Sequence, residues 1–208
     1  MINKIKSKIK GLLPFDSKDY WENRYMAGGD SGAGSYDAKA EYKANIFNSI
    51  VKEYNISDVI EFGCGDGNNL SYYNIDYYTG FDVSETAIKI CIDKYKEDSK
   101  KSFILYSPSK FKSGGLKSSM TISFEVIFHL VEDEVFIAYM KDLFNTSSKY
   151  VLICSSNDNN LKDMATHVKH RKFIDYISDD FILKTKIKTP QEGNLKGFFS
   201  DFYLFERS

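Results

Sequence analysis

The sequence predicts an α/β domain in which helices cover both faces of a mostly parallel sheet. Short runs of β-branched and aromatic residues alternate with segments of helical spacing, an order typical of parallel sheets. A glycine-rich turn, Gly63–Gly67, directly follows the first of these runs. The last two runs have no helix between them, which predicts a closing antiparallel hairpin.

We expect seven strands and at least three packed helices. The expected strands are Asp58–Phe62, Tyr77–Phe81, Ser102–Tyr106, Met120–Phe124, Tyr150–Ser155, Phe181–Thr189 and Phe198–Glu206. Apolar residues three or four positions apart mark the buried helix faces. These faces are Tyr42, Ile46, Phe47 and Ile50; Ile88, Cys91, Ile92 and Tyr95, after a cap at Ser84; and Val135, Phe136, Tyr139, Met140 and Leu143.

The length of 208 residues and the hydrophobic content of 42% suit one domain with its own core. We expect residues 1–45 to form an N-terminal arm and lid, residues 56–155 a ligand-binding core, and residues 156–208 a substrate loop and the hairpin. The stretch Met1–Leu13 alternates lysines with apolar residues. We interpret it as a loosely ordered arm, with contact to an anionic surface or partner as the alternative.

The net charge and the cysteine content limit which binding partners and which cellular compartment we expect. The net charge of −1 gives no indication of nucleic-acid binding. The three cysteines are scattered and fit reduced, buried thiols. No apolar run is long enough to span a membrane, and no signal-peptide core is present. We therefore expect a cytoplasmic protein.

The turn Gly63–Gly67 allows the backbone to come close to another group. Glycine can adopt sharp turns, and it has no side chain to block the approach. Its spacing is neither the dinucleotide fingerprint nor a phosphate-binding loop. Glu61 precedes it and suits a cationic or hydrogen-bonding ligand, while Asp82 ends the next strand, where a carboxylate can accept both hydroxyls of a ribose. Together these features predict a nucleoside-containing ligand.

Glu61–Gly67 and Gly80–Ser84 resemble the first two motifs of the class I S-adenosylmethionine methyltransferases, which have a Rossmann-like fold. The resemblance implies S-adenosylmethionine as cofactor, with Gly63, Cys64 and Gly65 at its methionine end. It places Glu61 in the network near the amino group, Asp82 on the ribose and Val83 on the adenine. The family often has an aspartate after the third strand. Tyr106-Ser107-Pro108 stands there, so Ser107 is the expected adenine contact, and Phe124 is a further expected cofactor contact.

Tyr20–Tyr25 and Gly32–Tyr36 resemble a narrower set of bacterial methyltransferases from small-molecule and glycan-modification pathways. In that set the region forms a lid over cofactor and substrate. The resemblance implies cofactor contacts from Trp21 and Arg24, and substrate contacts from Tyr25, Ser35 and Tyr36. The alternative is that the aromatic residues only dock a helix onto the core. Exposed aromatics in the lid would also suit a homodimer.

The three histidines follow the fourth and fifth predicted strands, where both loops face one edge of the sheet. We therefore predict that His129, His167 and His170 converge, and that one of them acts as general base for a hydroxyl acceptor. Glu125 is a further predicted substrate contact. Arg171 is expected to hold a phosphate or carboxylate group of the substrate.

The same region suggests a second chemistry. Glu125, His129, His167 and His170 form a ligand-like set for a divalent metal, similar to the small-RNA 3′-terminal ribose methyltransferases. Phe128 stands where that family has a second glutamate, so we expect no metal.

We accordingly expect O-methylation of a small polar acceptor such as a sugar, nucleotide sugar or phosphorylated metabolite, within surface-glycan biosynthesis. The alternatives are a metal-assisted RNA ribose 2′-O-methyltransferase and a non-catalytic cofactor-binding module.

Overall fold

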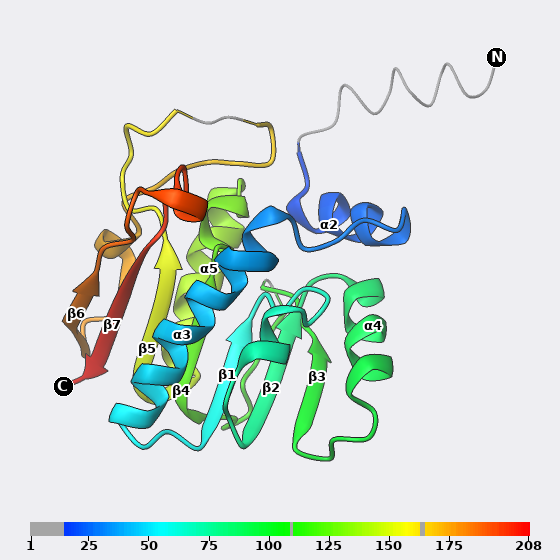
Figure 1. Cartoon of the computed structure of the whole chain (residues 1–208), viewed down its shortest axis with the longest axis horizontal. Helices are drawn as coiled ribbons and strands as arrows, with labels where there is room; N and C mark the ends of the chain where they lie inside the picture. The colour runs from blue at the N-terminus through cyan, green and yellow to red at the C-terminus, as the bar shows by residue number, and fades with distance from the viewer. Residues whose placement is uncertain (1–14, 109, 163–164) are drawn as a thin grey trace.

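The computed structural model describes residues 15–108, 110–162 and 165–208, so the basic stretch Met1–Leu13 lies outside the described residues. Its centre is a seven-stranded sheet with the order β3-β2-β1-β4-β5-β7-β6 (Figure 1). The strands are β1 (Asp58–Phe62), β2 (Tyr77–Asp82), β3 (Lys101–Leu105), β4 (Ser118–Phe124), β5 (Ser147–Ser155), β6 (Phe181–Ile187) and β7 (Asp201–Arg207). The predicted seven-stranded sheet is confirmed.

Strand β1 lies in the middle and pairs in parallel with β2 and β4. Strand β7 runs antiparallel to both of its neighbours, β5 and β6. The predicted hairpin is therefore confirmed. Its second strand starts at Asp201 instead of Phe198, because Thr189 closes the connecting loop: its main-chain N–H donates to Asp201 Oδ1 (3.0 Å) and its hydroxyl donates to the Ser200 carbonyl (2.6 Å).

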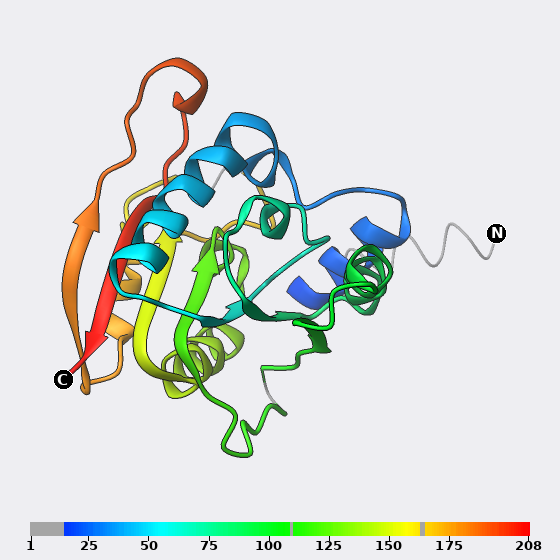
Figure 2. The ribbon, with the colours of Figure 1, turned by 60° about the horizontal axis from the view of Figure 1, so that its bottom comes forward.

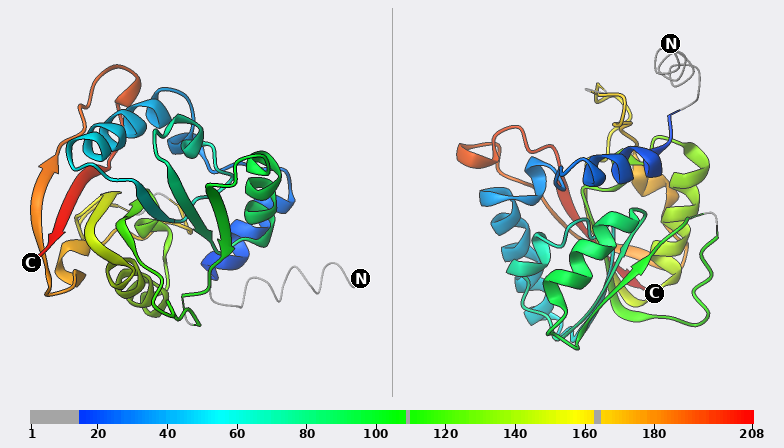
Figure 3. Two further views of the ribbon diagram at one scale, coloured as in Figure 1. Left: turned by 90° about the horizontal axis from the view of Figure 1, so that it is seen from below. Right: turned by 90° about the vertical axis from the view of Figure 1, so that its right-hand side faces the viewer.

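Helices cover both faces of the sheet. Helix α3 (Asp37–Glu53) and helix α4 (Glu85–Tyr95) share one apolar core with one face, and α5 (Asp133–Asn145) packs on the other. Figure 2 shows α3 and α5 on opposite sides of the strands. A further helix, α2 (Ser17–Met26), lies across the carboxyl ends of the strands (Figure 3). Single-turn 3₁₀ segments are η1 (Ala33–Ser35), η2 (Asn69–Tyr72), η3 (Ile127–His129), η4 (Phe173–Tyr176) and η5 (Gly193–Leu195).

One predicted core residue is wrong. Ile92 is 49% exposed, whereas Ile88 and Cys91 on the same helix are buried. Helix α4 covers the outer strands with a narrow stripe of side chains spaced three or four residues apart, and Ile92 lies one position beyond that stripe. Among the described residues, no helix combines the length and apolar character that crossing a membrane requires.

Candidate active site

A cavity of about 480 Å³ lies at the carboxyl ends of β1, β2 and β4, beneath α2 and the loop that follows it. Most of the residues singled out in the sequence line it: Trp21, Arg24, Tyr25, Ser35, Gly63, Cys64, Gly65, Asp82, Val83, Ser107, Phe124, Glu125, His129 and His167. Four others do not line it, namely Tyr36, Glu61, His170 and Arg171. In open α/β sheets this edge is the usual place for a ligand.

The glycine turn is in direct contact with the lid. Gly63 and Gly65 have φ angles of 84° and 56°, which side-chain-bearing residues rarely adopt. A Cβ on Gly65 would lie 2.3 Å from Ser31 Oγ and 2.9 Å from the Tyr25 hydroxyl. Side chains of the lid therefore rest directly on the turn.

Asp82 is buried beside this turn. Its two carboxylate oxygens accept hydrogen bonds from the main-chain N–H groups of Gly65 and Ser84, each at 2.9 Å. Burial raises the pKa of Asp82 to about 6, and these backbone bonds counteract the rise. Each oxygen keeps a second lone pair, so the carboxylate can still accept two ligand hydroxyls.

Glu61 stands behind the turn. Its carboxylate accepts hydrogen bonds from the hydroxyls of Tyr73 (3.4 Å) and Tyr78. Burial raises the pKa of Glu61 to about 7. The structure thus places Glu61 in a buried network with two tyrosines and not on the cavity wall.

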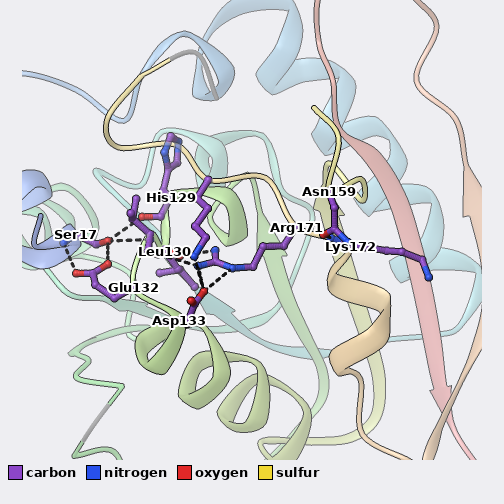
Figure 4. A network of polar contacts seen from close by, with 10 residues as sticks. Ser17, His129, Leu130, Glu132, Asp133, Asn159, Arg171 and Lys172 are labelled. Atoms are coloured by element: carbon purple, nitrogen blue, oxygen red, sulfur yellow. Dashed lines mark hydrogen bonds and ion pairs between the residues drawn. The ribbon is translucent and has the colours of Figure 1, made fainter. Parts of the chain in front are cut away.

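Helix α2 is fastened to the core at two points. At its start, the Ser17 N–H donates to Glu132 Oε1 (2.8 Å) and the Ser17 hydroxyl donates to the His129 carbonyl (3.0 Å), as Figure 4 shows. On the other side, Glu22 accepts hydrogen bonds from the hydroxyls of Ser84 (2.6 Å) and Thr86 (2.7 Å). The helix therefore bridges the loop after β4 and the start of α4.

The rest of the lid is held by Asp66, within the glycine turn. Asp66 Oδ2 accepts hydrogen bonds from the Ser31 N–H (3.0 Å) and the Tyr36 hydroxyl (2.6 Å). Tyr36, a predicted substrate contact, thus serves as an anchor of the lid. Arg24 is also engaged, since its guanidinium donates to Asp30 Oδ1 at 2.8 Å.

Two of the three histidines line the cavity. Nδ1 of His129 lies 2.9 Å from the His167 main-chain oxygen, and burial lowers the pKa of His129 to about 4. The ring of His167 stacks on Tyr20, with centroids 4.5 Å apart, and Trp21 meets His129 edge-on at 5.0 Å. Together they make an aromatic wall on one side of the cavity.

The structure does not bring the other two predicted residues of that loop to the cavity. His170 Nδ1 pairs with the Ser156 hydroxyl at 2.7 Å. The Arg171 guanidinium donates to the Leu130 carbonyl (2.6 Å) and to Asp133 (2.7 Å), as Figure 4 shows. It also donates to the Val131 carbonyl (2.8 Å). Arg171 thus holds the segment after β4 in place by satisfying two of its main-chain carbonyls.

Glu125 lines the cavity in an unusual backbone conformation, with φ at 60°. Its carboxylate accepts hydrogen bonds from Lys43 Nζ (3.3 Å) and the Ser200 hydroxyl (3.2 Å). Sequence reasoning missed Lys43, whose side chain is fully buried. A lysine in an amphipathic helix normally indicates an exposed position, so the sequence carried no signal for this pairing.

The suggested metal ligands are not assembled. Within residues 15–208, leaving aside positions 109, 163 and 164, no group of three or more histidine, cysteine, aspartate or glutamate side chains could hold a metal ion. Glu125 is committed to Lys43 and Ser200, and Phe128 lies beside His129 with ring centroids 4.6 Å apart.

The fold is that of known methyltransferase structures. The N-methyltransferase NodS from Bradyrhizobium japonicum WM9, in complex with S-adenosyl-L-homocysteine, matches with a TM-score of 0.74 and 14% identity over 93% of this chain and 99% of its own. Magnesium protoporphyrin IX methyltransferase (ChlM) from Synechocystis PCC 6803 matches with a TM-score of 0.64 and 16% identity over 93% and 100%. The methyltransferase domain of bacterial CtHen1 matches with a TM-score of 0.62 and 19% identity over 81% of this chain and 98% of its own. No protein-family model matches the sequence, and neither does any curated protein.

Proposed function

We propose that this protein is an S-adenosylmethionine-dependent methyltransferase that methylates a hydroxyl oxygen of a small, uncharged polar acceptor, such as a sugar. The observation that carries the acceptor chemistry is the neutral, oriented imidazole of His129 in the cavity wall. The fold, shared with structures that contain S-adenosyl-L-homocysteine, supports the choice of cofactor.

The residues at the carboxyl end of β1 and β2 fit the cofactor. Asp82 offers two carboxylate oxygens for ribose hydroxyls, and Val83 and Ser107 line the same cavity where an adenine would follow. Gly63 and Gly65 line the same cavity. When bound, the cofactor supplies a methyl group already activated by its sulfonium, so the protein mainly has to align the acceptor and exclude water.

The tautomer of His129 follows from its partner. A main-chain oxygen can only accept a hydrogen bond, so Nδ1 carries the proton and Nε2 carries the lone pair. A pKa of about 4 keeps the ring neutral at physiological pH. A hydroxyl becomes strongly acidic only as its oxygen bonds to the methyl carbon, and a weak base therefore suffices to accept the proton late in the transfer.

The charges around the cavity favour an uncharged acceptor over a phosphorylated one. Arg24 is paired with Asp30, and Arg171 is turned into the network around Asp133. Lys18 also lines the cavity, but it is exposed and its charge is screened by water. Glu125 also lines the wall, where its carboxylate is paired with the buried Lys43. The aromatic wall of Tyr20, Trp21 and His167 suits the apolar face of a sugar ring.

The test compares His129→Asn with the wild type on acceptors found by transfer of a labelled methyl group to sugars, nucleotide sugars and their phosphates. We expect turnover to fall by about 10²- to 10⁴-fold while S-adenosyl-L-homocysteine affinity stays unchanged. Wild-type turnover in the variant would contradict the assignment of the base. Tight binding of S-adenosyl-L-homocysteine without transfer to any acceptor would favour the non-catalytic module.

A further inference from the structure

Helix α2 covers the cavity without a broad apolar face to hold it there. Of its ten residues, only Ser17 and Tyr25 are buried. A segment with few buried apolar contacts belongs to the less stable parts of a structure and opens more readily than the core. The polar contacts of α2 with the rest of the protein therefore decide how firmly the cavity is closed.

Glu22 makes one of these contacts, at the start of α4. Its carboxylate accepts hydrogen bonds from the hydroxyls of Ser84 (2.6 Å) and Thr86 (2.7 Å) and from the Thr86 main-chain N–H (3.2 Å). The bond from Ser84, and then those from Thr86, lower the pKa of Glu22, so the side chain is ionised at neutral pH. A negative charge is also favourable here, because the first N–H groups of a helix have no partners within the helix.

Ser84 connects this contact to the carboxylate proposed for the ribose. Its hydroxyl donates to Glu22, and its main-chain N–H donates to Asp82 Oδ1 at 2.9 Å. One residue thus joins the carboxylate of the lid to the carboxylate of the nucleoside site. A ligand held by Asp82 and a closed α2 depend on the same short segment, so each should favour the other.

We propose that Glu22 is a positioning residue that latches α2 in its closed position, so that bound cofactor leaves only after this latch opens. The inference rests on the proposed function for the identity of the ligand, whereas the latch itself is a property of the free protein. Glu22 does not line the cavity and acts through the helix. The next residue on that helix toward the N-terminus, Trp21, meets the ring of His129 at 5.0 Å, so the same latch holds the aromatic wall in place.

The first test needs no ligand, because Trp21 is the only tryptophan in the chain and its fluorescence reports on α2. In Glu22→Ala we expect acrylamide to quench this fluorescence more strongly than in the wild type, since the open helix exposes the indole. Asp19→Ala is the matched control, because it removes an exposed carboxylate from the same helix and should leave quenching unchanged.

The second test follows the release of S-adenosyl-L-homocysteine by stopped flow. The dissociation rate constant of Glu22→Ala should rise about ten-fold, the low end for hydrogen bonds to a charged group because Glu22 is partly exposed to water. Thr86→Val removes one partner of the carboxylate from the side of α4 and should give a smaller rise. The double variant should release the ligand no faster than Glu22→Ala alone, because the two side chains act through one contact.

Unchanged quenching in Glu22→Ala would overturn the inference. So would additive effects of the two substitutions, which would show that Glu22 and Thr86 act separately. Failure of the wild type to bind S-adenosyl-L-homocysteine would overturn the proposed function, while the quenching of Trp21 in the free protein would still decide whether Glu22 holds the helix closed.

Discussion

His129 and His167 are joined through the backbone: Nδ1 of His129 lies 2.9 Å from the carbonyl oxygen of His167, and the two rings stack with centroids 5.3 Å apart. The loop after β5 thus fixes the tautomer of a histidine that follows β4. The neighbouring bond from the Lys169 N–H to the Phe128 carbonyl (2.8 Å) holds the same two segments together. The bond that orients the candidate base is made by the main chain of His167 and not by its side chain.

The first prediction concerns the protonation of His129. Its pKa is lowered from 6.5 to about 4 by burial, so the ring should stay neutral until the pH falls toward 4. Because the unfolded chain binds this proton already near pH 6.5, acidification should also remove stability between pH 6.5 and 4. NMR titration of the ring protons gives the midpoint directly. A midpoint near 6.5 for His129 would contradict the burial that the proposed base requires.

Much of the fold could be predicted because it rests on local patterns. Alternating strands and helices, the turn Gly63–Gly67 and the final hairpin all follow from residue types at short spacing, and the structure has them. Ile92 could not be predicted, because the width of the buried stripe on α4 depends on how the helix sits on the edge of the sheet. Periodicity alone does not carry that information.

The site was less predictable where a side chain has two plausible partners. Arg171 and Tyr36 have the chemistry of ligand contacts, but the fold offers Arg171 the carbonyls of Leu130 and Val131, and offers Tyr36 the carboxylate of Asp66. Lys43 showed no motif at all. Its role depends on contact with Glu125, which is distant in the sequence and meets Lys43 only after folding.

The second prediction concerns proton release on cofactor binding. The pKa of Asp82 is raised from 3.8 to about 6 by burial. Because the folded protein then holds this proton more tightly than the unfolded chain, the contribution of Asp82 to the free energy of unfolding is lost as the pH rises through 6. Ribose hydroxyls that donate to the carboxylate favour its ionised form and lower that pKa. At pH 6 about half of the Asp82 carboxyls carry a proton, so binding of S-adenosyl-L-homocysteine should release about half a proton per site, and at pH 8 it should release none. Calorimetry in two buffers with different ionisation heats counts the protons.

Asp82→Asn is the control for that experiment, since its amide cannot ionise. The release at pH 6 should disappear in this variant. A release that persists would assign the proton to Glu61, whose pKa is about 7 behind the turn.

The third prediction concerns the buried pair of Lys43 and Glu125. Removing the amine in Lys43→Met leaves a largely buried carboxylate without its cation, which should lower the free energy of unfolding by about 3–5 kcal/mol. The double variant with Glu125→Gln should recover part of that loss, because the unpaired charge is gone. Urea unfolding measures both. Lys89→Met, which removes the exposed pair with Glu85, serves as control and should change stability little; a similar cost for both lysines would refute the buried pairing.

The last prediction separates backbone strain from lid contact at Gly65. Gly65 and Gly193 have nearly the same φ, 56° and 54°, but a Cβ on Gly193 meets nothing within 4 Å. Gly193→Ala should thus cost only the strain of a left-handed residue, about 1–2 kcal/mol in urea unfolding, and leave ligand affinity unchanged. Gly65→Ala adds contact with Ser31 Oγ and the Tyr25 hydroxyl, and should displace the lid. We expect it to lose S-adenosyl-L-homocysteine affinity and to expose α2 to faster amide exchange. Equal behaviour of the two variants would mean that the lid does not rest on the glycine turn in solution.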